Sequence, residues 1–162
     1  MHKNKFDIVV VGAGHAGVEA ALISSFLGNS VAIITMYINA LARMSCNPAI
    51  GGLAKGQMVR EIDVLGGVMA KTADLSGLQF KTLNKSKGRA VWSPRAQVDK
   101  RLYERTVYKK LANSSVSVIQ SEATAVNIKN NKIEGVFLRS GEEIKCLSLI
   151  VTAGTFLSGV IH

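Results

Sequence analysis

The chain has 162 residues, of which 48% are hydrophobic, and a net charge of +9, which suits one soluble globular domain with a buried core. No apolar run reaches the ~18 to 20 residues of a membrane-spanning helix, and Met1 to Lys5 is too short and polar for a signal peptide. We therefore expect a cytoplasmic protein with no membrane partner. Two distant cysteines and three scattered histidines form neither a CxxC pair nor a zinc pattern, so we expect no metal site and no structural disulfide.

An apolar run from Phe6 to Val11 is followed directly by the sequence GAGHAG. The run predicts a buried parallel strand, and the GxGxxG spacing predicts a glycine turn that approaches a pyrophosphate and lets a helix pack closely behind it. We expect that helix at residues 17–27 and a second strand from Val31 to Ile34, which completes a β-α-β unit. The predicted dinucleotide-binding loop comprises Gly12, Ala13, Gly14, His15, Ala16 and Gly17.

Thr35 stands at the end of the second predicted strand, where an NAD-binding domain usually has an acidic residue for the ribose. Its hydroxyl can still contact a ribose, but it weakens the case for NAD. An NAD-type domain would also continue with another strand and helix. Here a long stretch of loops and helices follows, with helices expected at residues 55–65 and 94–113. The sequence therefore favours FAD.

Short strands are predicted between Ser117 and Ile144, with turns at Asn130-Asn131 and Ser140-Gly141, and a last strand runs from Leu147 to Val151. A threonine-glycine turn, Thr152 to Thr155, follows. This order resembles the glutathione-reductase class of flavoproteins, in which a small antiparallel meander precedes a strand that returns to the ADP site. We predict an α/β fold, a Rossmann-like FAD-binding domain with a parallel sheet, helices and an antiparallel β-meander. The alternative is an ordinary α/β domain with a hairpin insertion.

The positive charge is concentrated in residues 81–110, which contain ten Lys or Arg and only two acidic residues. Much of it would lie on the predicted helix at residues 94–113, which we expect Pro94 to begin. Such a face can bind the phosphates of a nucleic acid, but a run of charge is commonly no more than a solvated face. The sequence leaves both interpretations open.

Cys46 lies in a turn-rich loop, Ser45 to Gly52, rather than in a core strand. Arg43 and Lys55 are close in sequence, and the N-terminus of the helix expected next would add positive potential, so these influences favour a thiolate. A reactive cysteine and a small buried one both remain open. Cys146, in the apolar part of a strand, is predicted to be structural.

Several segments together indicate one family. They are GAGHAGVEAA, MSCNPAIGGLAKG, EIDVLGGVMAK, LQFKTLNKSKG, RAQVDKRLY and TAGTFLSGVIH, and they extend over the whole chain. On these segments the chain resembles the N-terminal part of the tRNA uridine 5-carboxymethylaminomethyl modification enzymes, the MnmG or glucose-inhibited division protein A family. CNPAIGG and RAQ are the most specific of them. One departure is Arg89, which replaces the proline that the family commonly has between Gly88 and Ala90.

The resemblance implies an FAD-dependent enzyme that adds a carboxymethylaminomethyl or aminomethyl group at C5 of the wobble uridine of tRNA. It also implies a homodimer that joins a GTPase partner, MnmE, in a heterotetramer, with NADH and methylene-tetrahydrofolate as co-substrates. Uracil C5 becomes nucleophilic once a group adds at C6, and a thiolate suits that addition when the base is turned out of its stack. Cys46 matches one of the family's two important cysteines, and its role as C6 nucleophile, proton-transfer group or another stays open.

The family's binding residues carry over onto this sequence. Thr124 matches a position whose backbone contacts the adenine, and threonine is common in the family at position 35. The positions that match the loop beside the flavin's isoalloxazine ring are Asn47, Pro48, Gly51 and Gly52. Gly154 lies in the turn after the strand that returns to the ADP site. The basic positions expected to contact RNA or folate are Lys85, Lys87 and Arg95.

The chain is much shorter than members of this family, which have roughly six hundred residues, enough for several domains. The resemblance therefore predicts that residues 1–162 are the N-terminal part of an FAD-binding domain, without the rest of that domain, the inserted NADH domain and the C-terminal helical domain. We expect such a chain to be inactive alone and to bind FAD weakly. The alternatives are another flavoprotein, such as a folate-dependent tRNA uracil methyltransferase, and a non-enzymatic nucleotide- or RNA-binding remnant.

Overall fold

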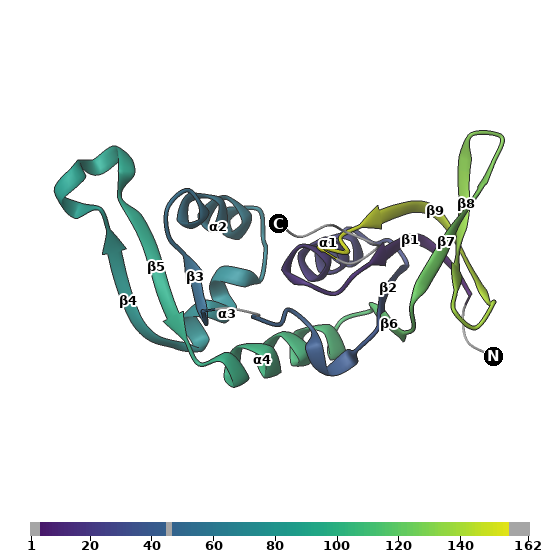
Figure 1. Ribbon diagram of the computed structural model, residues 1–162, viewed down its shortest axis with the longest axis horizontal. Helices are drawn as coiled ribbons and strands as arrows, with labels where there is room; N and C mark the ends of the chain where they lie inside the picture. The colour runs from purple at the N-terminus through teal and green to yellow at the C-terminus, as the bar shows by residue number, and fades with distance from the viewer. Residues whose placement is uncertain (1–3, 45–46, 156–162) are drawn as a thin grey trace. The chain divides into compact units, whose positions relative to one another are not determined.

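The computed structural model describes residues 4–44 and 47–155. The chain forms two compact units (Figure 1). Residues 1–42 and 111–162 make the first unit, and residues 43–110 make the second. The second unit is therefore inserted in the chain between two parts of the first.

A six-stranded mixed sheet forms the centre of the first unit, with the strand order β6-β2-β1-β9-β8-β7. β6, β2, β1 and β9 run parallel, and β8 and β7 continue the sheet as an antiparallel meander. This order confirms the predicted Rossmann-like domain of the glutathione-reductase type. The strands are β1 (Lys5–Val11), β2 (Val31–Thr35), β6 (Ser117–Gln120), β7 (Ala123–Lys129), β8 (Lys132–Leu138) and β9 (Glu143–Val151).

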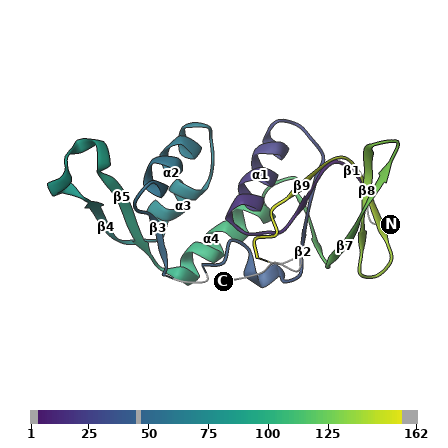
Figure 2. The same ribbon diagram turned by 45° about the horizontal axis from the view of Figure 1, so that its top comes forward.

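Helix α1 (His15–Phe26) follows β1 and lies against β1 and β2 (Figure 2). The helix presents small residues to the sheet, because Gly17 and Ala21 are buried, as are Val10 and Ile33 on the strands. It stops where Gly28 adopts a φ of 90°, which favours glycine. The predicted helix is thus confirmed, with its start two residues earlier than expected.

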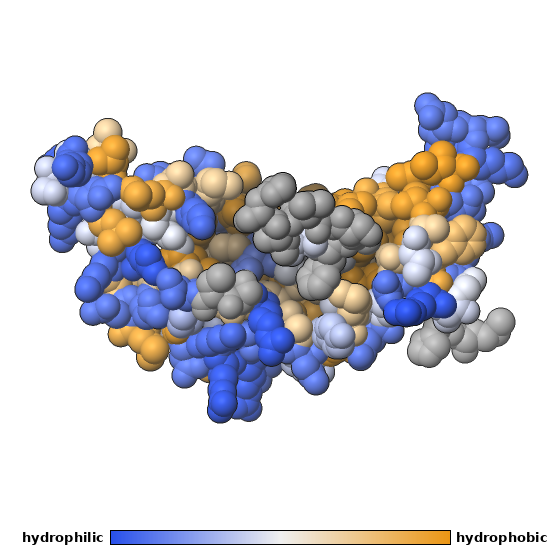
Figure 3. Space-filling model, in the orientation of Figure 1, coloured by the Kyte–Doolittle hydropathy of each residue, from blue (hydrophilic) through white to orange (hydrophobic). Residues whose placement is uncertain are grey.

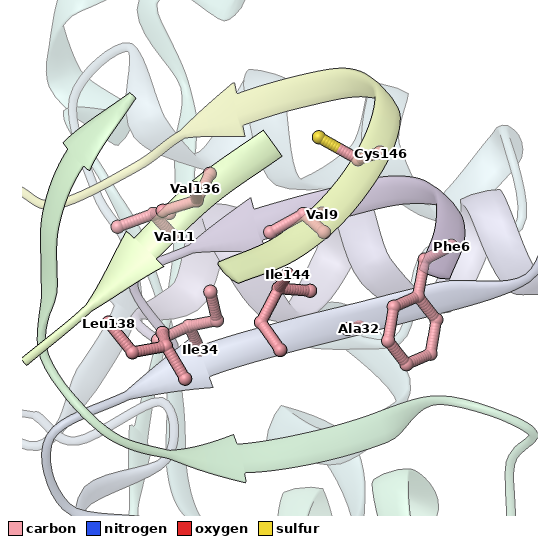
Figure 4. Packing of buried hydrophobic residues seen from close by; sticks show 9 residues of the cluster. All are labelled: Phe6, Val9, Val11, Ala32, Ile34, Val136, Leu138, Ile144 and Cys146. Atoms are coloured by element: carbon pink, nitrogen blue, oxygen red, sulfur yellow. The ribbon is translucent and has the colours of Figure 1, made fainter. Parts of the chain in front are cut away.

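A hydrophobic cluster lies on the other face of β1 and β2, under the meander (Figure 4). Successive side chains of a strand point to opposite faces, so Val9 and Val11 enter this cluster while Val10 faces α1. Both faces of β1 are thereby buried, which explains its uninterrupted apolar sequence. The cluster contains Phe6, Val9, Val11, Ala32, Ile34, Val136, Leu138, Ile144 and Cys146.

The meander has the turns that the sequence predicts. Asn130 and Asn131 have φ values of 50° and 58°, the left-handed pair that a two-residue hairpin requires, and Gly141 has a φ of 85°. β9 is longer than the predicted final strand, because Glu143 to Lys145 already pair with β8. The same strand then runs beside β1 as far as Val151.

A three-stranded antiparallel sheet, with the order β3-β5-β4, belongs to the second unit. Helices α2 and α3 contact its strands, and two short 3₁₀ helices form the tip of the β4–β5 hairpin. The elements are β3 (Ala49–Gly51), α2 (Lys55–Val64), α3 (Met69–Leu75), β4 (Gly77–Leu83), η2 (Lys85–Lys87), η3 (Arg89–Val91) and β5 (Ser93–Val98). Two further helices are η1 (Ile38–Ala40), in the first unit, and α4 (Lys100–Ala112), which runs across the boundary.

This sheet corrects two predictions. First, the stretch after β2 contains three strands as well as loops and helices. Second, the first residues of the helix predicted at 94–113 form a strand instead. Pro94 lies in β5, and α4 begins only after Asp99, whose carboxylate accepts a hydrogen bond of 2.9 Å from the Leu102 N–H. Asp99 is the helix N-cap because it satisfies an amide that has no partner within the helix.

Within the described residues, no helix is long and apolar enough to cross a membrane.

Candidate dinucleotide site and basic hairpin

The glycine loop follows β1 and has the geometry that its spacing predicts. Gly12 has a φ of +99°, and a Cβ atom at this position would lie 2.6 Å from the Thr152 carbonyl oxygen. A Cβ at Gly17 would overlap the Gly12 carbonyl oxygen, so the close approach of α1 requires glycine there. Among the described residues, no atom lies within 4 Å of a Cβ placed on Gly14. Two glycines therefore serve the packing, and the third faces open space.

The open space lies at the N-terminus of α1. Gly14 is the N-cap, with an extended φ of −71° and ψ of −173°, and no side chain caps the helix. The first turn of the helix contains no acidic residue. The first amides of a helix lack partners within it and carry partial positive charge, so they suit an anion. The loop thus suits a diphosphate, and no described residue fills the space beside Gly14.

His15 occupies the first position of α1. Burial lowers the pKa of its imidazole, and the nearby Glu19 opposes this shift more weakly. A lowered pKa leaves the ring neutral at neutral pH. The attraction of this loop for an anion therefore depends on backbone amides rather than on a charged imidazole.

Thr152 fixes the loop to the rest of the sheet, and our sequence reasoning missed it. Its hydroxyl lies 3.0 Å from the Val11 carbonyl oxygen and 2.9 Å from that of Gly12, and its N–H donates to Val11 at 2.8 Å. The side chain thus holds the last residue of β1 and the first glycine. The available signal was its position directly after the strand that returns beside β1.

The remaining predicted residues of the first unit lie near the carboxyl ends of its parallel strands. Thr35 ends β2, and its hydroxyl is 3.5 Å from the Tyr37 carbonyl oxygen. Gly154, with a φ of +63°, follows β9. Thr124 comes just after β6, at the start of β7, and its hydroxyl donates to the Phe137 carbonyl at 3.2 Å. The structure brings Gly12, Thr35 and Gly154 to the sheet edge where such folds bind ligands.

A second set of predicted residues lies in the second unit. Gly51 has a φ of +91° and pairs with Arg95 of β5, and a Cβ on it would overlap the Pro94 carbonyl oxygen. Gly52 has a φ of +100°, and its N–H donates to the Pro94 carbonyl at 2.8 Å, while no described atom lies within 4 Å of its Cβ position. Asn47 is exposed, and the Pro48 carbonyl accepts from the Val98 N–H at 2.8 Å. Cys46 itself lies outside the described residues.

Lys85 and Lys87 lie in η2 at the tip of the hairpin, and Arg95 lies on β5. The basic stretch therefore divides between this hairpin and α4, which carries the basic residues from Lys100 to Lys110.

Cys146 is 4% exposed and belongs to the hydrophobic cluster. Burial, and secondarily Glu143, raise the pKa of its thiol. This environment confirms the prediction that Cys146 is structural. Across residues 4–44 and 47–155 there is no cluster of three or more His, Cys, Asp or Glu that could hold a metal ion.

The strand, glycine loop, helix and meander together define the glutathione-reductase class of α/β nucleotide-binding folds. Residues 7–162 match the family model described as glucose inhibited division protein A, GIDA. The chain therefore belongs to the GIDA family.

Close relatives carry the name tRNA uridine 5-carboxymethylaminomethyl modification enzyme MnmG. That of Endomicrobium trichonymphae is 50% identical over 161 residues, which are 99% of this chain and 27% of the relative. That of Aquifex aeolicus is 48% identical over 98% of this chain and 26% of the relative. The chain thus spans about a quarter of the length of the curated relatives that it matches.

The fold agrees with solved structures. Aquifex aeolicus GidA superposes with a TM-score of 0.91 at 48% identity, over 94% of this chain and 26% of that one. The flavin-dependent brominase Bmp2 superposes with a TM-score of 0.63 at 24% identity, over 95% of this chain and 40% of that one. The second likeness concerns the fold alone.

Proposed function

We propose that this chain is the N-terminal part of the FAD-binding domain of an enzyme that modifies C5 of the wobble uridine in tRNA. Membership of the GIDA family and half identity to relatives named for this modification support the proposal. The observation that carries the cofactor assignment is the open position at Gly14, at the start of a helix without a side-chain cap. An FAD diphosphate needs such an approach to backbone amides.

The proposed cofactor contacts come from the predicted residues of both units. The loop at residues 12–17 would hold the diphosphate through its amides, and Thr35 and Thr124 would flank the adenosine. Asn47, Pro48, Gly51 and Gly52 are assigned to the surroundings of the ring system, and Gly154 to the turn that follows the strand returning to the ADP site. When bound, FAD would supply redox chemistry, with NADH as the source of reducing equivalents.

Cys46 is the proposed catalytic residue. A thiolate that adds to C6 of uracil makes C5 nucleophilic toward a one-carbon unit. Methylene-tetrahydrofolate is the proposed donor of that carbon, and glycine or ammonia the proposed source of the nitrogen. Loss of the C5 proton then expels the thiolate and restores the ring. The alternative roles of Cys46 are proton transfer and structure. Lys85, Lys87 and Arg95 are proposed to contact RNA or folate.

The proposed assembly is the one that the family resemblance implies. It is a homodimer that works with the GTPase MnmE in a heterotetramer in the cytoplasm. Residues outside this chain would complete the FAD domain and supply the NADH and helical domains.

The first experiment separates cofactor binding from folding. Gly14 has backbone angles that any residue adopts, so Gly14→Val should keep the fold and fill the space above the loop. We expect flavin binding, followed by quenching of flavin fluorescence, to fall at least tenfold while the melting temperature stays within about 2 °C. Ala112→Val, an exposed helix substitution, is the control and should bind flavin as the wild type does. Unchanged flavin binding by Gly14→Val would contradict the assignment.

The second experiment tests the reaction. A chimaera in which this chain replaces the matching quarter of the Aquifex aeolicus relative is introduced into a bacterium that lacks the modification, and tRNA nucleosides are analysed by mass spectrometry. We expect carboxymethylaminomethyl- or aminomethyluridine with the wild type and neither with Cys46→Ser. Appearance of 5-methyluridine instead would favour a folate-dependent uracil methyltransferase. Retained modification with Cys46→Ser would remove the proposed role of the thiol.

A further inference from the structure

The β4–β5 hairpin carries one sign of charge. From Gly77 to Val98, all of which the structure describes, there is no Asp or Glu. Four of the basic side chains are exposed, and Arg95 is half-buried. Hydrophilic side chains lie at the outer edge of this hairpin, at the far left of Figure 3, with hydrophobic ones beside them. The basic residues are Lys81, Lys85, Lys87, Arg89 and Arg95.

Part of this charge opposes the pairing of the strands. Lys81 of β4 lies directly opposite Arg95 of β5 in the register. Like charges in opposite positions destabilise a strand pair. Among the described residues neither side chain forms an ion pair that would offset the repulsion. An anion bound across the pair would supply the missing countercharge.

The same hairpin holds an aromatic ring among its cations. The Trp92 Nε1–H donates to the Lys85 carbonyl oxygen at 3.2 Å, and the Arg89 guanidinium lies 5.9 Å from the ring centroid. These two contacts fix the indole against the tip, yet the residue stays 39% exposed. An aromatic surface flanked by cations is what unpaired nucleotides bind, because the ring stacks on a base while the cations neutralise phosphates.

We propose that the β4–β5 hairpin binds unpaired nucleotides of an RNA, with Trp92 stacking on a base. Lys81, Lys85 and Lys87 neutralise the adjoining phosphates. The inference rests on the proposed tRNA substrate. It adds that this hairpin contacts a single-stranded loop of the RNA rather than a double helix. A base within a duplex has no free face for the indole. Phe80 is outside this site, because it pairs with Ala96 and its ring lies over Gly77.

Trp92 is the single tryptophan of the chain, so intrinsic fluorescence reports directly on this site. The purified chain is titrated at low salt with an unstructured RNA of about ten nucleotides, and separately with a blunt RNA duplex of the same length. We expect saturable quenching by the single strand and little quenching by the duplex. Equal quenching by both, or none by the single strand, would overturn the proposal.

Substitutions test the stacking and the charge independently, with affinity measured by the anisotropy of a labelled RNA. Trp92→Ala should weaken binding about 5- to 100-fold, and Trp92→Phe should recover most of the affinity, because one aromatic–base stack is lost and regained. Lys85→Gln and Lys87→Gln should each lower the slope of log affinity against log salt by about 0.7. Lys132→Gln removes an exposed charge from the first unit and should leave the affinity unchanged. Far-UV circular dichroism checks that each variant is folded.

The outcomes separate this inference from the proposed function. Wild-type affinity of Trp92→Ala, or binding of a heparin fragment as tight as that of RNA, overturns the hairpin site. If nucleoside analysis still finds the modified uridine, the proposed function stands without the hairpin site. Trp92-dependent binding of the single strand with no modified uridine in the cell confirms the site and overturns the proposed reaction.

Discussion

At the scale of single residues, Thr152 shows how one hydroxyl can hold a binding loop in place. It is shared between the Val11 and Gly12 carbonyls, at the point where the first strand becomes the glycine loop. An isosteric side chain without the hydroxyl keeps the volume and leaves both carbonyls without this donor. The Gly12 carbonyl would then lose its bond to the Thr152 side chain, while the Val11 carbonyl would keep the bond from the Thr152 N–H.

We predict that Thr152→Val lowers the free energy of unfolding by about 1 kcal/mol, the usual net effect of losing a hydrogen bond, since these bonds are only partly buried. Urea unfolding followed by far-UV circular dichroism measures it. Thr152→Ser keeps the hydroxyl and should retain most of the stability. Equal stability of the valine variant and the wild type would show that the hydroxyl contributes little.

Cys146 gives a prediction for pH. Because its pKa is raised in the folded chain, the neutral thiol is favoured there, and the unfolded chain ionises first. Its contribution to stability is therefore complete below the ordinary thiol pKa of 9.0 and is lost as the pH rises through the higher folded value. The wild type should lose more stability between pH 7 and pH ~10 than Cys146→Val, which has no thiol to ionise. Parallel pH profiles of the two proteins, measured by urea unfolding, would contradict this.

At the scale of elements, α4 depends on its N-cap, the residue just before the helix. We predict that Asp99→Ala destabilises the chain by about 0.5–2 kcal/mol, because the Leu102 N–H loses its acceptor. Asp99→Asn retains a capping oxygen and should cost much less, which thermal unfolding can compare. A loss of equal size in both variants would assign the effect to charge among the neighbouring lysines and arginines instead of to the cap.

The elements that the sequence predicts correctly are those with local signals. The first strand, its glycine loop and α1 follow from an apolar run and three glycines, and the meander follows from Asn130-Asn131 and Gly141. The second sheet could not be found in this way, because β3 has three residues and β5 contains Pro94. Both are strands through pairing with residues distant in the chain.

In the candidate site too, the residues with a local sequence signal could be predicted and those brought together by distant pairing could not. Gly12, Gly14 and Gly17 could be predicted because the GxGxxG spacing lies within six consecutive residues. Thr152 becomes part of the loop because β9 pairs with β1. The resemblance to flavoproteins predicted the returning strand and its threonine-glycine turn, but not that this hydroxyl would hold the loop. Trp92 and Lys85 likewise meet only once the hairpin tip is formed.

At the scale of the whole molecule, large apolar side chains remain exposed in both units. Phe26 is 85% exposed at the end of α1, and Val64 and Leu65 are 87% and 77% exposed at the end of α2. Exposed groups of this kind promote association. We predict that the purified chain binds the dye ANS and self-associates at tens of micromolar, and that Val64→Ser with Leu65→Gln reduces both.

Light scattering and ANS fluorescence measure the effect. The matched control is Lys129→Ser with Lys132→Gln, which changes exposed polar residues and should leave both signals as in the wild type. A wild-type chain that stays monomeric and binds no dye would show that these side chains are too scattered to associate.

The double pairing of β9 has a consequence for synthesis on the ribosome. The Thr152 hydroxyl meets a carbonyl 141 positions earlier in the chain, so β1 emerges long before the strand that lies beside it is translated. Closing so long a loop is slow, because much entropy is lost before any contact forms. Until then the nascent first strand has an unpaired edge, which makes early translation the period when this polypeptide most needs a chaperone.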